Sequence, residues 1–161
     1  GTIRSLELLQ AWHKLGEKIS ILGPWGGESG QAWALGPFHD TPFRLLKITV
    51  WYGNAVDGLQ FQYELGGDGV IIDSPLYGKN MGTSAEIPLV DDELTVIRVG
   101  PGVGPDIIAA LTFFTNNGLF YGPYLRERGK KLKVELNGSI AGFFGHASNH
   151  VYGLGIYMKP K

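Results

Sequence analysis

The fold is decided by the stretch LLKITVWYGNAVDGLQFQYEL, residues 45–65. In Leu45–Tyr52 and again in Leu59–Leu65, apolar residues alternate with polar ones, which is the period-two pattern of a half-buried β-strand. Between the two runs, Gly53 and Asn54 are residues that favour turns. The stretch therefore predicts a strand, a turn and a second strand.

Similar short runs continue along the chain and are separated by glycine-rich turns. Glycine makes up 25 of the 161 residues, and it supplies the positive φ angles that tight turns need. The further predicted strands are Lys18–Leu22, Gly69–Asp73, Glu86–Pro88, Leu94–Val99, Ile107–Thr115, Leu119–Tyr121, Lys131–Glu135, Ile140–Gly145 and Gly153–Met158. This pattern predicts an all-β domain.

A weak internal repeat indicates how the strands are grouped. An aromatic residue followed by glycine recurs at Trp25-Gly26, Tyr77-Gly78 and Tyr121-Gly122, at offsets of 52 and 44 residues. Repeats of this length predict three similar β units, which three Greek-key sheets around a pseudo-threefold axis would provide.

The first residues follow a different pattern. Apolar residues recur every third position from Ile3 to Leu15, which predicts a short amphipathic helix over Thr2–Leu15. We therefore expect an N-terminal helical extension or linker over residues 1–17 and one domain over residues 18–161. The chain begins at Gly1 without Met, which is compatible with a trimmed chain that has lost a targeting segment. A linker at this end would be compatible with a larger multidomain protein.

Composition excludes several classes of function. The chain has 14 basic and 15 acidic residues, so it lacks the positive charge that nucleic acids or anionic membranes attract. No apolar run is long enough for membrane insertion. The absence of cysteine excludes disulfides, and together with the lack of a visible signal peptide it favours the cytoplasm, although the localisation stays open.

Several segments together resemble the jacalin-related lectins. They follow one another in the family's order over roughly residues 19–161, and they are Gly23–Gly30, Val56–Tyr63, Gly82–Ile87, Leu111–Asn117, Tyr121–Tyr124, Gly142–Gly145 and Gly153–Tyr157. The resemblance implies a β-prism of three four-stranded sheets that binds glycans without metal or another cofactor. The unbroken segment around Gly30 resembles the mannose/glucose branch of the family. The resemblance is also compatible with a homodimer.

The family's principal sugar site is altered in this chain. The resemblance pairs Gly30 with the loop of residues 148–152 and implies roles for Asn149, His150 and Val151. The carboxylate that accepts sugar hydroxyls in the family falls on Tyr152, and no acidic residue follows Glu135. Loss of a charged acceptor is expected to cost about 2–3 kcal/mol of binding free energy.

A second constellation is intact. The pattern Gly-x-x-x-Asp runs from Gly53 to Asp57 and includes Asn54 and Val56, and its partner loop is residues 78–82 with Gly82. It predicts a second carbohydrate-binding site, although the same residues would also form a simple turn. A third copy, residues 102–106 beside residues 122–126, is predicted to be a structural turn because Pro105 has no N–H group to donate.

These observations predict a lectin module of mannose/glucose type rather than an enzyme. No pair of carboxylates or nucleophile–base set stands out in the sequence, and the spacing of the histidines does not indicate a metal site. The alternative is a β-prism that has lost monosaccharide binding and serves as a protein-interaction or targeting module.

Overall fold

The computed structural model describes residues 19–101, 107–125 and 132–160, and all regular structure within these ranges is β-strand. The strands are β1 (Ser20–Gly26), β2 (Gln31–Leu35), β3 (Phe43–Tyr52), β4 (Val56–Leu65), β5 (Ile71–Asp73), β6 (Tyr77–Gly78), β7 (Thr83–Pro88), β8 (Leu94–Pro101), β9 (Ile108–Thr115), β10 (Phe120–Tyr124), β11 (Leu132–Glu135), β12 (Ser139–Ala147) and β13 (Val151–Lys159). The helix predicted for Thr2–Leu15 lies outside the described residues. In the part of the chain that is described, no helix is long and apolar enough to cross a membrane.

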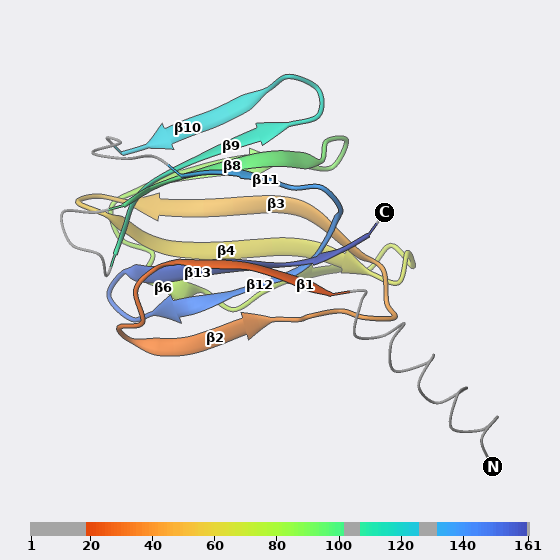
Figure 1. The fold of residues 1–161 in the computed structure, drawn as a ribbon, viewed down its shortest axis with the longest axis horizontal. Coiled ribbons are helices and arrows are strands. Elements are labelled where there is room, and N and C mark those ends of the chain that lie inside the picture. Colours follow the sequence, from red (N-terminus) through yellow and green to blue (C-terminus); the bar gives the residue numbers. More distant parts are fainter. Residues whose placement is uncertain (1–18, 102–106, 126–131, 161) are drawn as a thin grey trace, which may run out of the picture.

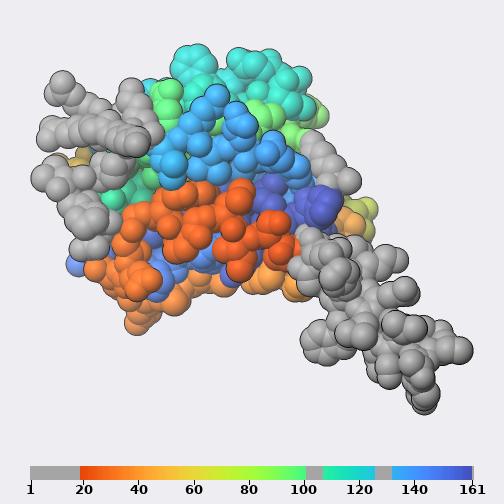
Figure 2. Space-filling view, viewed as in Figure 1, coloured from red at the N-terminus to blue at the C-terminus, as the bar shows by residue number. Residues whose placement is uncertain are grey.

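The strands form three antiparallel sheets, as predicted (Figure 1). Their strand orders are β1-β13-β12-β2, β5-β4-β3-β7 and β10-β9-β8-β11. In the last two sheets, the final strand returns to lie beside the first, which is the Greek-key order. The first sheet has the same order when the chain is read from β12 and β13 on to β1 and β2, so it combines strands from both ends of the described chain. Figure 2 shows the red and orange residues of β1 and β2 lying against the blue C-terminal strands.

The core lies where the three sheets meet. Strands β4, β9 and β13, one from each sheet, contact one another pairwise. Each sheet also contributes one fully buried phenylalanine, namely Phe61 from β4, Phe113 from β9 and Phe143 from β12. The rings of Phe61 and Phe143 stack with their centroids 4.3 Å apart. No sheet buries its apolar face alone, so the three sheets are expected to fold as one unit.

Two strands were not predicted. The segment Gln31–Leu35 forms β2, although its two alanines give it little strand propensity. Pairing with β12 and the stacking of Trp33 on Tyr77, with ring centroids 4.0 Å apart, fix it in place. The short strand β6 lies beside β4 on the same edge as β5, so these two segments together make the fourth strand of their sheet.

Proline interrupts or distorts two of the edge strands. Between β5 and β6, the Ser74 hydroxyl accepts a hydrogen bond from the Phe61 N–H at 2.9 Å, just before Pro75. A Gly-Pro dipeptide is a turn signal and predicts a turn at Gly23-Pro24. This prediction is wrong, because β1 continues through both residues as a bulge with Gly23 at φ +88°. A bulge on an edge strand accommodates a proline that cannot donate to the ladder.

The inter-sheet core can be tested with Phe61→Ala. The side chain is 1% exposed, so the substitution is expected to lower the free energy of unfolding by about 3–5 kcal/mol. Phe120→Ala is the control, because that ring is 64% exposed and its loss is expected to change stability by less than about 0.5 kcal/mol. Urea unfolding followed by tryptophan fluorescence measures both, and equal effects would contradict a core shared by the sheets.

Candidate functional site

The two partner loops predicted for the principal site lie against each other. Gln31 at the start of β2 pairs with Ala147 at the end of β12, which brings Gly30 beside the loop that leads into β13. A Cβ atom on Gly30 would lie 2.7 Å from the carbonyl group of Ala147 and 3.1 Å from the Ser148 nitrogen. The φ angle of Gly30 is +83°, so both backbone conformation and space require glycine here.

The loop between β12 and β13 is held by its own backbone. The Ser148 N–H donates to the His150 carbonyl at 3.0 Å, and the Gly27 N–H donates to the Tyr152 carbonyl at 2.6 Å. Val151 is buried, whereas Asn149 is exposed. Of the residues that the resemblance implied here, Val151 therefore has only its backbone to offer a ligand.

The imidazole of His150 and the ring of Tyr152 meet edge to face, with centroids 5.8 Å apart. Both side chains are half-buried, so they retain surface that a ligand can contact. The position of the family's carboxylate therefore holds an aromatic ring beside a histidine.

The predicted second site is also assembled. A Cβ atom on Gly82 would lie 2.4 Å from the Tyr52 carbonyl oxygen and 3.3 Å from the Gly53 nitrogen, so the two loops are in backbone contact. Gly53 and Asn54 are exposed, and the Gly53 N–H donates to the Ala55 carbonyl at 3.0 Å. The side chain of Val56 is fully buried and belongs to the core.

The start of β4 is fixed by the segment before Gly82. The Lys79 N–H donates to the Asp57 carbonyl at 2.8 Å. A Cβ atom on Gly78 would lie 2.2 Å from the same oxygen, and one on Gly58 would lie 2.3 Å from the Lys79 oxygen. This close packing holds the backbone of Asp57 in one position.

One side-chain contact joins the two predicted sites. The Nδ1 atom of His150 lies 2.5 Å from the Oδ1 atom of Asp57, although the residues are 93 positions apart and belong to different sheets. Asp57 is only 7% exposed. The sequence shows no carboxylate near the 148–152 loop, but the fold brings Asp57 to it.

Two tyrosines that the sequence analysis did not single out lie beside the second site. Tyr52 immediately precedes Gly53, and its ring lies 5.3 Å from that of Tyr124 on β10. Burial raises the pKa of the Tyr124 hydroxyl, and the neighbouring Tyr52 and Tyr121 hydroxyls raise it further. Tyr124 is therefore a neutral O–H group at physiological pH. The predicted third constellation, residues 102–106, lies outside the described residues.

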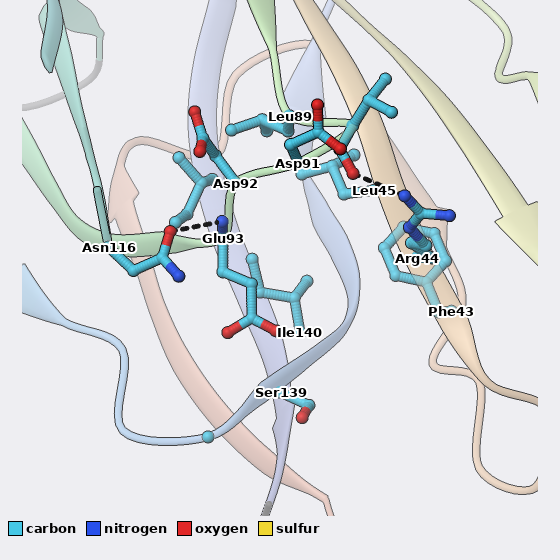
Figure 3. A pocket seen from close by; sticks show the side chains of 13 residues that line it. Phe43, Arg44, Leu45, Leu89, Asp91, Asp92, Glu93, Asn116, Ser139 and Ile140 are labelled. Carbon is cyan, nitrogen blue, oxygen red and sulfur yellow. Dashed lines mark hydrogen bonds between the residues drawn. The ribbon is translucent and has the colours of Figure 1, made fainter. Parts of the chain in front are cut away.

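A separate cavity of about 430 Å³ lies at the other end of the prism (Figure 3). Its lining includes Phe43 at the start of β3, and Asp91, Asp92 and Glu93 from the turn after β7. The Glu93 N–H donates to the Asn116 side-chain oxygen at 3.0 Å, which closes one side of the cavity. None of the predicted sugar-binding residues lines it.

Comparison with known proteins identifies the family of this chain and its fold. The family model for the Jacalin-like lectin domain matches residues 22–157. Horcolin from Hordeum vulgare is 33% identical over 146 residues, which are 86% of this chain and 96% of that protein. Jacalin-related lectin 3 from Arabidopsis thaliana is 32% identical over 148 residues, which are 85% of this chain but 24% of that protein. The structure of AcmJRL, a mannose binding jacalin related lectin from Ananas comosus, is similar with a TM-score of 0.75 at 32% identity, covering 89% of this chain and 99% of that one.

The contact between the second-site loops can be tested with Gly82→Ala. Gly69→Ala is a matched control, because the two glycines have φ angles of +81° and +82° but no atom lies within 4 Å of a Cβ on Gly69. The left-handed conformation costs about 1–2 kcal/mol in both variants. We expect Gly82→Ala to lower the free energy of unfolding by more than Gly69→Ala does, because the added methyl group at position 82 meets the Tyr52 carbonyl. Equal losses in urea unfolding would contradict the close contact.

Proposed function

We propose that this chain, which belongs to the jacalin-like lectin family, binds mannose- or glucose-containing glycans without metal at the loops where the sheet of β12 and β13 meets the sheet of β3 and β4. The family is one of carbohydrate-binding proteins rather than enzymes. The observation that most directly supports this proposal is the contact of Asp57 with His150, which brings residues of the two predicted sites together. AcmJRL, which shares the fold, is described as mannose binding.

The chemistry of these loops suits a neutral sugar. Sugar hydroxyls both donate and accept hydrogen bonds, so a site for them needs both kinds of group. The glycine-rich loops at Gly30, Gly53 and Gly82 allow the backbone to approach a sugar ring closely. Asp57 and His150 supply polar side chains, and aromatic rings such as Tyr152 can cover an apolar sugar face.

A second candidate function is a protein-interaction or targeting module. It is favoured by two features: Tyr152 occupies the position of the expected carboxylate, and Asp57 is almost buried with one oxygen already bonded to His150. A homodimer, or a place in a larger multidomain protein, would compensate for weak single sites through avidity.

Binding calorimetry with methyl α-mannoside tests the proposed function. Asp57→Ala is expected to weaken binding at least about tenfold, which corresponds to 1.4 kcal/mol, because it removes the carboxylate on which the polar contacts of the site depend. Asp91→Ala, which removes an exposed carboxylate at the other end of the prism, is expected to bind as wild type.

A glycan array extends this test to larger ligands. We expect wild-type protein to bind arrayed glycans that carry terminal mannose or glucose. A folded wild-type protein that binds neither methyl α-mannoside nor any arrayed glycan would contradict the lectin proposal and favour the protein-interaction module.

A further inference from the structure

We propose that the Nε2 atom of His150 serves as the hydrogen-bond acceptor that the principal site has lost, and that Asp57 positions this imidazole from the neighbouring sheet. The inference rests on the proposed lectin function and deepens it. It assigns Asp57 a positioning role instead of direct contact with a sugar in a separate second site. The two predicted sites then form one composite site for a neutral glycan.

The 2.5 Å contact decides which ring nitrogen carries the proton. An ionised carboxylate can only accept hydrogen bonds, so the Nδ1 atom of His150 must donate to the Oδ1 atom of Asp57. A neutral imidazole has a single N–H group. When that group is at Nδ1, Nε2 presents a lone pair and accepts a hydrogen bond. In the neutral form of His150, the Asp57 carboxylate therefore leaves Nε2 as an acceptor.

Both partners of this contact are held in place. Asp57 is 7% exposed, and its backbone carbonyl accepts from the Lys79 N–H at 2.8 Å. The His150 carbonyl accepts from the Ser148 N–H at 3.0 Å, and the imidazole and the ring of Tyr152 meet edge to face. An acceptor that is already oriented loses little conformational entropy when a ligand binds.

The Nε2 atom is available to a ligand. The side chain of His150 is 36% exposed, and within the described ranges its only hydrogen-bond partner is Asp57. Exposed Ser148 and Asn149 precede it, and Gly30 lies against Ser148. The imidazole therefore occupies the loop in which the family has its carboxylate. A neutral nitrogen accepts one hydrogen bond from a sugar hydroxyl where a carboxylate accepts two, so we expect weaker binding than with an aspartate.

Direct contact of Asp57 with the sugar and an acceptor role of His150 predict opposite effects on binding when the histidine is removed. If the sugar bonds to the Asp57 carboxylate, removing His150 frees the Oδ1 atom, and binding is kept or strengthened. If His150 supplies the acceptor, removing it abolishes binding. The substitution His150→Asn separates the two roles. Its amide N–H can take the place of Nδ1 and still donate to Asp57, whereas the shorter side chain has no acceptor atom at the position of Nε2.

The first measurement is made without ligand. At about pH 8, where an ordinary imidazole is neutral, the ¹⁵N shifts of the ring nitrogens report the tautomer. We expect the Nδ1–H form in wild type. Asp57→Asn is expected to shift His150 toward the Nε2–H form, because the asparagine amide can donate to Nδ1. A wild-type ring in the Nε2–H form would overturn the positioning role.

The second measurement is the affinity for methyl α-mannoside. Asp57→Asn, His150→Asn and His150→Ala are each expected to lower the affinity for methyl α-mannoside at least about tenfold. This change corresponds to 1.4 kcal/mol of binding free energy. The controls Asp91→Asn and His39→Ala alter exposed residues away from these loops and are expected to match wild type. Amide spectra verify that each variant is folded.

Two outcomes separate this inference from the proposed function. Wild-type affinity or tighter binding in His150→Asn would overturn the acceptor role of His150 alone and restore Asp57 as the direct ligand. A wild-type protein that shows the Nδ1–H tautomer but binds no sugar would overturn the proposed function, and with it the acceptor role.

Discussion

The structure depends on three sheets closing their apolar faces around one core. Phe61, Phe113 and Phe143 enter that core from the three different sheets, and all are at most 2% exposed. Burial of each ring contributes about 1.5–3 kcal/mol, but only while the other two sheets exclude water from it. The first sheet is complete only when β1 and β2 join β12 and β13. Closure of the core therefore also brings distant parts of the chain together.

The same closure assembles the proposed glycan-binding site. The start of β4 and the loop before β13 belong to different sheets, yet Asp57 and His150 meet because these sheets share a core. Glycines at positions 30, 78 and 82 let the neighbouring backbones approach to distances that a Cβ atom would prevent. The loops are thus held by backbone packing, and the polar side chains between them are oriented before a ligand arrives. In the proposed composite site, the imidazole of His150 takes over from the lost carboxylate, and Asp57 from the adjacent sheet orients it.

Much of the fold could be predicted because its strands carry a local signal. The alternation in Leu45–Tyr52 and Leu59–Leu65 is visible in single segments, and both are strands in the structure. The strand Gln31–Leu35 has no such signal, because pairing with β12 and the stacking of Trp33 hold it. Local patterns alone therefore miss elements that tertiary contacts stabilise.

The site was predictable only in part. The resemblance paired Gly30 with residues 148–152 and Gly53–Asp57 with Gly82, and the structure shows both pairs of loops in contact. The bond between Asp57 and His150 joins residues 93 positions apart, and no spacing rule or local pattern indicates it. Sequence reasoning therefore treated the two sites as separate and the principal one as lacking a carboxylate.

The most direct test of the account is a titration with methyl α-mannoside followed by backbone amide shifts. One composite site predicts that residues 53–57 and 148–152 shift together, with the same saturation curve. Shifts in only one of these segments, or around the cavity near Phe43 and Asp92, would contradict it.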